Sequence, residues 1–250
     1  MRALILAILF LGTVQATAAE IEIALTDDRV TVDTGFAGAR LTLFGAITGV
    51  ANPASYDIIS VIRGPDARFR LRRMEKNNLI WTPGQSHIIE NAPGLYLTNA
   101  TRPISDVATL PAQAVHRLDA NYLDIEVDTI RRTATEDRET AMFRDAFISE
   151  ARSLGLYRSR VGGISFKKGA LFTIHARLPA NTPVGDYDVT VFLFHNGELI
   201  GSDTASLAVH RVGLERRIYD FAHQRPVSYG IFCVAMSLFA GWVASLAFRK

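Results

Sequence analysis

Residues 171–200 read LFTIHARLPANTPVGDYDVTVFLFHNGELI, and this stretch decides the fold. Apolar and polar residues alternate in two runs, 170–179 and 187–195, so one face of each run is apolar. This period of two is typical of half-buried antiparallel strands. Residues 179–185 carry two prolines and a glycine and predict a turn between the runs, and Asn196-Gly197 predicts a tight hairpin after the second run. The apolar faces consist of Phe172, Ile174, Ala176 and Leu178 in the first run and of Tyr187, Val189, Val191 and Leu193 in the second.

The same alternation recurs along the rest of the chain. Many short strands separated by turn residues predict a mainly β domain, an immunoglobulin-like antiparallel β-sandwich. One helix at 136–156 interrupts the strands, because apolar residues such as Phe143, Phe147 and Ala151 recur there at helical spacing. We expect this helix to be a packed insertion between two sets of strands. The further strands are predicted at 21–25, 29–34, 40–45, 56–62, 67–72, 79–82, 122–129 and 204–211.

Two apolar segments bracket the chain and predict its topology. Residues 3–12 have the length of a signal-peptide core and small residues follow them, so residues 1–19 are predicted to be a signal peptide. Residues 227–248 contain no charge and span about 33 Å as a helix, which matches the hydrocarbon core of a bilayer. More arginines precede this helix than follow it, against the positive-inside tendency, but a long exported domain crosses largely regardless of such charge.

These segments divide the chain into five parts. The signal peptide is followed by an exported β-sandwich domain at 20–211, a transmembrane helix at 227–248 and a cytoplasmic tail at 249–250. Between domain and helix, residues 212–226 form an amphipathic juxtamembrane segment with apolar residues on one side. This segment either rests on the membrane surface or packs on the sandwich as a short helix.

Composition limits the chemistry that the exported domain can perform. The formal net charge of +2 is too near balance to indicate a nucleic-acid partner. The only cysteine, Cys233, lies inside the predicted membrane helix, so the domain has neither a disulfide nor a thiol nucleophile. Six histidines are scattered without a metal-binding motif, and no nucleophile-elbow or nucleotide-binding motif occurs. We therefore expect no metal, no cofactor and no enzymatic activity.

A basic stripe is the most suggestive feature of the predicted domain. Arg68, Arg70 and Arg72 alternate along one strand, and Arg63 precedes them, so these four arginines are candidates for binding an anion. The alternative is a solvated or edge face whose cations discourage sheet-to-sheet pairing. An acidic stripe of Asp124, Glu126 and Asp128 either binds a cation or, if its strand neighbours the basic one, forms a cross-strand charge ladder with it.

The predicted membrane helix carries a face of small residues. Ser237, Gly241 and Ser245 repeat at four-residue spacing, which places them on one side of the helix. Small residues let a second helix approach closely in lipid, so this face predicts association with another membrane protein. The alternative is that small residues are simply common in such helices.

Four runs of the sequence resemble a known family. They lie at 33–47, 56–82, 178–200 and 229–250, and include FGAI, the RGP turn before the basic strand and a GW-containing C-terminal helix. Together they resemble the alphaproteobacterial putative transmembrane protein family over nearly the whole mature chain. The resemblance implies a single-pass protein of the bacterial inner membrane with its bulk in the periplasm, and it transfers no catalytic residue.

The sequence therefore predicts a periplasmic interaction module, anchored in membrane lipid, that serves as an accessory subunit of an inner-membrane transporter or envelope complex. The main alternative is an anion-binding or sensor module that uses Arg63, Arg68, Arg70 and Arg72. An envelope hydrolase is a third reading, which requires a polar cleft.

Overall fold

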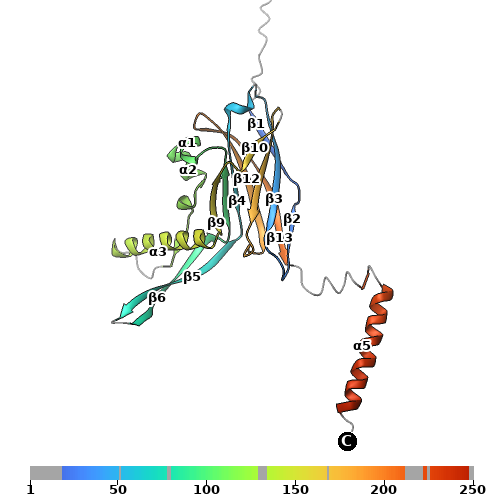
Figure 1. Cartoon of the computed structure of the whole chain (residues 1–250). Coiled ribbons are helices and arrows are strands. Elements are labelled where there is room, and N and C mark those ends of the chain that lie inside the picture. Colours follow the sequence, from blue (N-terminus) through green and yellow to red (C-terminus); the bar gives the residue numbers. More distant parts are fainter. Residues whose placement is uncertain are drawn as a thin grey trace, which may run out of the picture.

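The computed structural model describes residues 19–50, 52–77, 80–128, 134–167, 169–211, 222–223 and 226–247. Within these ranges the chain is mainly β, with a few helices and one apolar C-terminal helix, which confirms the coarse fold prediction (Figure 1). The predicted signal peptide lies outside the described residues except for Ala19, and so do most of the juxtamembrane segment and the whole tail.

Two large sheets carry most of the strands, and we call them sheet I and sheet II. In sheet I all neighbouring strands are antiparallel. In sheet II the two edge strands β2 and β9 run parallel to their neighbours, so the prediction of purely antiparallel strands is wrong at these edges. Sheet I has the order β1 (Glu20–Leu25), β3 (Ala39–Thr48), β11 (Leu171–Leu178), β10 (Ile164–Phe166). Sheet II has the order β2 (Arg29–Val32), β13 (Glu198–Arg211), β12 (Gly185–His195), β4 (Asp57–Arg63), β7 (Tyr96–Ala100), β9 (Tyr157–Val161).

The apolar faces of sheets I and II share one core. The alternating residues of β11 and β12 are buried in it as predicted, together with Leu43 of β3 and Ile62 of β4. After β12, Asn196 and Gly197 have φ angles of 51° and 88° and connect His195 to its partner Glu198, which confirms the predicted tight hairpin. At the start of β12 the buried Tyr187 hydroxyl donates a hydrogen bond of 2.6 Å to the Pro183 carbonyl.

A long insertion covers the other face of sheet II. It contains a third sheet, sheet III, and the helix α3 (Ala134–Ser153), which confirms the predicted helix. Phe147 of α3 lies in a second core with residues of sheet II such as Val61 and Phe194. The inner strands of sheet II, β4, β7 and the second half of β12, are therefore buried on both faces. The remaining elements are β5 (Asp66–Asn77), β6 (Ile80–Pro93) and β8 (Glu126–Val127) of sheet III, the short helices α1 (Ile104–Val107) and α2 (Leu110–Val115), and the 3-10 turns η1 (Pro53–Ser55) and η2 (Ala120–Tyr122).

The predicted strand at 122–129 is mostly wrong. Among residues 122–128, which the structure describes, only Glu126–Val127 pairs as a strand, and the chain before it forms the turn η2. The Asp119 carboxylate accepts a hydrogen bond of 2.9 Å from the Asn121 backbone N–H and so stabilises this turn. The sequence pattern also missed β7, β9 and β10. All of β7 is buried, so it lacks the alternation by which a half-buried strand is recognised.

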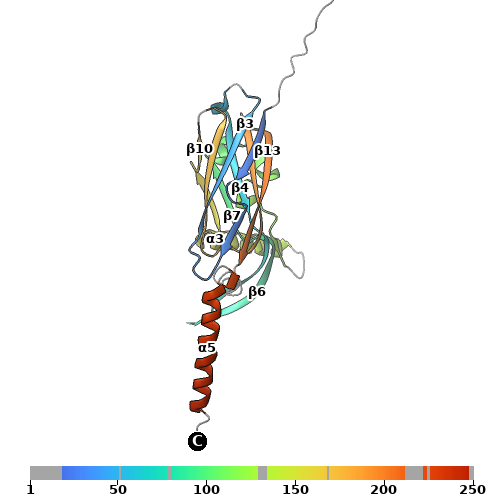
Figure 2. The same ribbon diagram turned by 90° about the vertical axis from the view of Figure 1, so that its right-hand side faces the viewer.

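Sheet III and the end of β13 lie at the same end of the sandwich. Arg63 at the end of β4 is opposite Asp188 of β12. Three residues before Asp188, Gly185 of β12 is opposite Val209 near the end of β13. β5 begins three residues after Arg63, so the β5–β6 hairpin projects from the end at which β13 finishes. Figures 1 and 2 show this arrangement from two sides. We call this the anchor end.

The C-terminal helix α5 (Pro226–Ala247) matches the predicted membrane helix in position and length. Pro226–Ala244 is long and apolar enough to cross a bilayer, and none of this stretch is buried against the rest of the protein. Because a helix that is apolar on all sides would expose a large apolar surface to water, this segment suits a lipid environment.

At the opposite end, Asp57 ties the start of β4 to the chain after β7. Its carboxylate accepts hydrogen bonds of 2.9 Å from the Thr101 hydroxyl and from Arg102 Nε, and it forms an ion pair with the Arg102 guanidinium. The bond to Arg102 lowers the pKa of Asp57 below its ordinary value of 3.8. The ionised form of Asp57 is therefore stabilised by folding.

Gly45 is a close-packed point between β3 and β11, and we expect it to tolerate no side chain. A Cβ atom there would lie 2.2 Å from Phe172 Cζ and 2.8 Å from the Glu22 carbonyl oxygen. Gly45→Ala should lower the free energy of unfolding by about 2 kcal/mol through overpacking. Denaturant unfolding of the detergent-solubilised chain measures this loss. Phe172→Leu in the same chain should cancel part of it, and two additive losses would contradict the proposed clash.

Asp57→Asn should destabilise the domain at neutral pH and not in acid. The lowered pKa means that the stabilisation is complete above the ordinary pKa of 3.8 and is lost as pH falls through the folded-state value. We expect a loss of about 1 kcal/mol at pH 7, because Arg102 is partly exposed, and a much smaller difference near pH 3. Unfolding curves at both pH values test this, and Asp186→Asn on the exposed side of β12 is the control without such a difference.

Candidate functional site

The four arginines of the predicted anion site lie on two different sheets. Arg63 is in β4 and its guanidinium lies 2.5 Å from the Asp66 carboxylate. Arg68 in β5 lies 2.9 Å from Glu90 of the neighbouring β6. Two of the four are therefore already paired with carboxylates. Arg70 and Arg72 are exposed and lie together at the border of a groove described below.

The acidic stripe does not face the basic one. β6 lies between β5 and β8, so the two stripes are not on neighbouring strands and the predicted charge ladder is wrong. Asp124 forms an ion pair with Arg117 instead. Glu126 is opposite Glu90 of β6 in the register. No group of three or more potential metal ligands comes together within the described part of the chain.

An apolar groove lies between β5 and α3 at the anchor end. Its volume is about 300 Å³, and its walls are almost entirely apolar. Phe69 of β5 contacts Phe147 of α3 across its base, with the ring centroids 4.9 Å apart. Arg70, Arg72 and Glu150 place charged groups at its border. The walls consist of Phe69, Leu71, Gly94, Phe147, Ala151, Leu154, Leu156 and Tyr157.

The groove exists because β5 and α3 touch along only part of their length. α3 presents Phe143, Phe147 and Ala151 to the insertion core, and the ring of Phe143 contacts His87 of β6 in a tilted arrangement, with the ring centroids 4.1 Å apart. Beyond the end of α3, Leu154 turns away from this core and is 53% exposed. Leu154 and β5 thus leave a space that no side chain of the described chain fills.

Tyr157 forms the inner wall of the groove and is fixed in place. Its hydroxyl donates a hydrogen bond of 2.8 Å to the Pro93 carbonyl, and its ring meets Phe147 edge to face. Burial raises the pKa of Tyr157 above the ordinary phenol value, so the wall carries no charge at neutral pH. The groove is therefore an apolar surface with a fixed inner wall and with charges only at its border.

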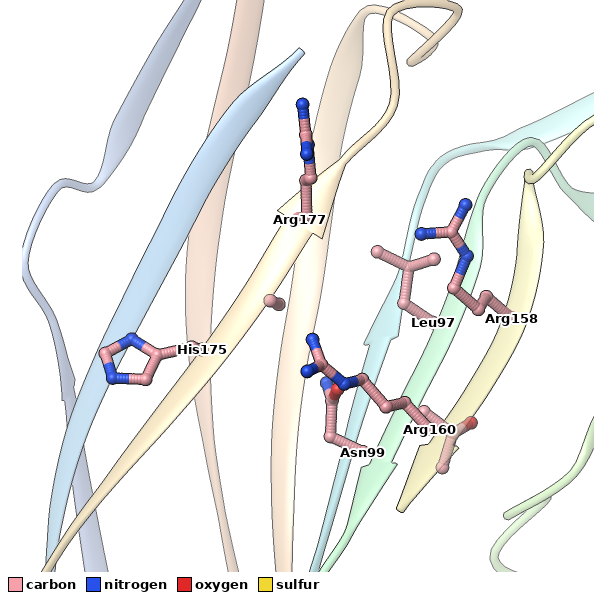
Figure 3. Close-up of a pocket in the computed structure, with 8 residues that line it drawn as sticks. Leu97, Asn99, Arg158, Arg160, His175 and Arg177 are labelled. Atoms are coloured by element: carbon pink, nitrogen blue, oxygen red, sulfur yellow. The ribbon is translucent and has the colours of Figure 1, made fainter. Parts of the chain in front are cut away.

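A second feature is a small basic cleft on the inner face of β9. Arg158 and Arg160 lie on the face of β9 opposite to Tyr157 and point toward sheet I (Figure 3). The neighbouring strand β7, also in sheet II, places Leu97 and Asn99 beside them. Arg177 and His175 of β11 also border the cleft but point away from it in Figure 3. The cleft holds only about 30 Å³.

The basic cleft is open because sheet I ends early at this side. β10 pairs with β11 only from Phe172 to Ile174, so no strand of sheet I covers the inner face of β9. Within the described residues no ion pair neutralises Arg158 or Arg160. Arg158 and Arg160 were not among the predicted site residues, although cations alternate in 157–161 as they do in 68–72.

The small residues of α5 lie on an open helix face. Ser237 and Gly241 are exposed, and no atom lies within 4 Å of a Cβ added at Gly241. The Ser237 hydroxyl donates a hydrogen bond of 2.8 Å to the Cys233 carbonyl, so its polar group is satisfied within the helix. Ser245 follows at the same spacing within α5. The face is available to a partner helix.

Comparisons with known proteins give one sequence family and a weak structural likeness. The first domain of VCBP3 from Branchiostoma floridae matches with 10% identity, covering 78% of this chain and 97% of that one, at a TM-score of 0.27. No curated protein matches the sequence. The model of the family described as "Putative transmembrane protein" (Alph_Pro_TM) matches residues 20–250, that is, the β domain and the C-terminal helix together. The chain therefore belongs to the Alph_Pro_TM family of putative transmembrane proteins.

Proposed function

We propose that the protein is a membrane-anchored interaction module, with its β domain in the periplasm and α5 in the bacterial inner membrane. In this role it is an accessory subunit of an inner-membrane transporter or envelope complex. The observation that carries the proposal is the apolar groove between β5 and α3, which lies at the anchor end, where a membrane-embedded partner is within reach.

The dimensions and chemistry of the groove favour a protein partner. Partner proteins anchor large apolar side chains in such dry pockets and surround them with polar contacts. The space of about 300 Å³ accommodates one or two side chains, and Arg70, Arg72 and Glu150 supply the polar border. Most of the groove wall comes from the insertion, and β9 of sheet II adds Tyr157.

The anchor offers a second contact to the same partner. Two helices associate in lipid when their backbones can approach closely. The small residues Ser237, Gly241 and Ser245 permit such an approach on one face of α5. The predicted signal peptide and the length of the exported domain support the proposed orientation. A partner that spans the membrane and extends into the periplasm can engage helix and groove together.

The proposal includes an immunoglobulin-like sandwich of the variable type. The orders β1-β3-β11-β10 and β2-β13-β12-β4-β7-β9 follow the A-B-E-D and A′-G-F-C-C′-C″ arrangement of such domains. The bond from Tyr187 to Pro183, at the start of the strand equivalent to F, resembles a tyrosine corner. On this reading sheet III is inserted mainly between C and C′, and α3 between C′ and C″.

The second candidate is an anion-binding module that uses the basic cleft. Arg158 and Arg160 are aimed into an inner face beside the buried Asn99 amide, which is a more convergent donor set than the predicted arginines of β4 and β5. An oxyanion the size of phosphate or a carboxylate suits guanidinium donors. The alternative is that inward cations protect the edge strand β9 from pairing with another chain.

The groove proposal predicts a variant that separates binding from folding. Leu154→Arg should lower the recovery of a co-purifying membrane protein in mild detergent about tenfold or more, because a charge replaces an apolar contact in a central pocket. The residue is 53% exposed, so the domain should unfold at the same temperature as the wild type. Quantitative mass spectrometry of the purified complex measures the recovery.

Leu171→Arg is the matched control for this experiment. Leu171 is 55% exposed on β11 and lies outside the groove, so its replacement should leave recovery unchanged. Gly241→Ile should weaken recovery through the helix contact. Absence of any co-purifying membrane protein from the wild type, or equal losses in both arginine variants, would contradict the proposed function.

The anion candidate has its own test in the purified full-length chain. Inorganic phosphate should raise the temperature of thermal unfolding, and Arg160→Gln should remove this shift while Arg177→Gln keeps it, because Arg177 points away from the cleft. An equal response of wild type and Arg160→Gln would show a nonspecific salt effect and contradict an anion site.

A further inference from the structure

The tip of the β5–β6 hairpin exposes three large apolar side chains. Met74, Ile80 and Trp81 are 52%, 70% and 61% exposed. In the hairpin register Trp81 is opposite Lys76, and Ile80 is opposite Asn77. Because residues alternate between faces, Trp81 and Ile80 lie on opposite sides of the hairpin. Each side of this end thus carries a large exposed apolar side chain beside the polar residues Glu75, Lys76 and Asn77, and such an amphipathic end suits the interface between water and an apolar medium.

Arginines follow directly behind this apolar tip. Arg72 and Arg73 are exposed and, being consecutive in β5, point to opposite faces. No ion pair involves either of them within the described residues. At a strand rise of about 3.3 Å per residue they lie roughly 10 Å behind Trp81 along the hairpin. This distance is about one Debye length, so these cations feel an anionic surface that the tip touches.

The hairpin projects from the end of the sandwich at which the chain leaves β13 toward α5. It leaves the sandwich at the anchor end, the end at which β13 finishes with Arg211 (Figure 2). Residues 212–225 separate Arg211 from α5, and fourteen residues span at most about 50 Å. The twelve residues of β5 extend about 40 Å at a strand rise of 3.3 Å. A domain tethered by α5 therefore has its hairpin tip within reach of the same bilayer.

We infer that the tip of the β5–β6 hairpin is a second membrane contact, in which Met74, Ile80 and Trp81 enter the interfacial layer and Arg72 and Arg73 bind anionic lipid headgroups. Tryptophan favours this layer because its ring is apolar and its N–H requires a polar partner. Two contacts, α5 and the tip, fix the height and tilt of the domain above the membrane. This inference requires α5 to lie in the bilayer, and it does not depend on a protein partner in the groove.

The two tryptophans of the chain allow a direct test. Trp242→Phe leaves Trp81 as the only tryptophan, and Trp81→Phe leaves Trp242 in α5 as the reporter of the anchor. The full-length chain is reconstituted in vesicles of phosphatidylcholine alone or with one third phosphatidylglycerol. Quenching of tryptophan fluorescence is then measured with aqueous iodide and with a lipid that carries a nitroxide near its headgroup.

A water-exposed reference residue is needed, and β3 supplies it. Phe44 is exposed on the outer face of sheet I, so Phe44→Trp in a chain lacking both native tryptophans reports a site away from the hairpin. We expect iodide to quench Trp81 at least threefold less than this reference, and the nitroxide lipid to quench Trp81 and not the reference. Arg72→Gln with Arg73→Gln should reduce the protection, and phosphatidylglycerol should increase it.

The outcomes separate the hairpin contact from the anchor and from the proposed function. If Trp81 is as accessible to iodide as the reference while Trp242 is protected, α5 is inserted and the hairpin inference is wrong. Equal protection of Trp81 in both lipids, unchanged by the arginine substitutions, contradicts the headgroup contact. Because the vesicles contain no other protein, none of these results depends on the groove or on a partner.

Discussion

Burial of the inner strands of sheet II on both faces is the constraint on which the rest of the structure depends. One face packs on sheet I and the other on the insertion, so its inner strands must be apolar on both sides. β4 is buried from Ile58 to Ile62, and β12 is buried without a break from Val191 to Phe194. The insertion is thereby part of the folded unit, and α3, sheet III and the groove between them are held in a defined position against the sandwich.

Most of the strands that the sequence predicted have alternating exposure, and β4, which is buried from Ile58 to Ile62, is an exception. β11 and β12 were found because a polar face accompanies each apolar face, and the helix at 136–156 because its apolar residues keep a period of 3.6. β7 escaped because Tyr96–Ala100 is entirely buried. β10 escaped because three residues are too few for a pattern, and the parallel pairing of β2 and β9 depends on contacts between distant parts of the chain.

The candidate sites show the same limit of local patterns. Alternating cations in 68–72 indicated a surface, but the carboxylate partner of Arg68 is Glu90, twenty-two residues away, and only the pairing of β5 with β6 reveals it. The groove was not predictable at all, because its walls come from β5, α3 and β9 and its volume is set by where α3 ends. The basic cleft at Arg158 and Arg160 was not predictable either, because it depends on how far β10 extends along the edge of sheet I.

The pairing of β2 with β13 has a consequence for biogenesis. Arg29 is opposite Ala208, and the Ile23 backbone N–H donates to the Asp203 carboxylate across 180 residues of sequence. Such non-local contacts delay folding until both segments are present. β2, whose strand partner in the described chain is β13, must therefore wait unpaired until β13 is available, whereas β1 can pair earlier with β3. Arg211 at the end of β13 is followed closely by α5. The β domain therefore closes only when nearly all of the chain ahead of α5 has been synthesised, so completion of the fold and availability of the C-terminal helix coincide in time.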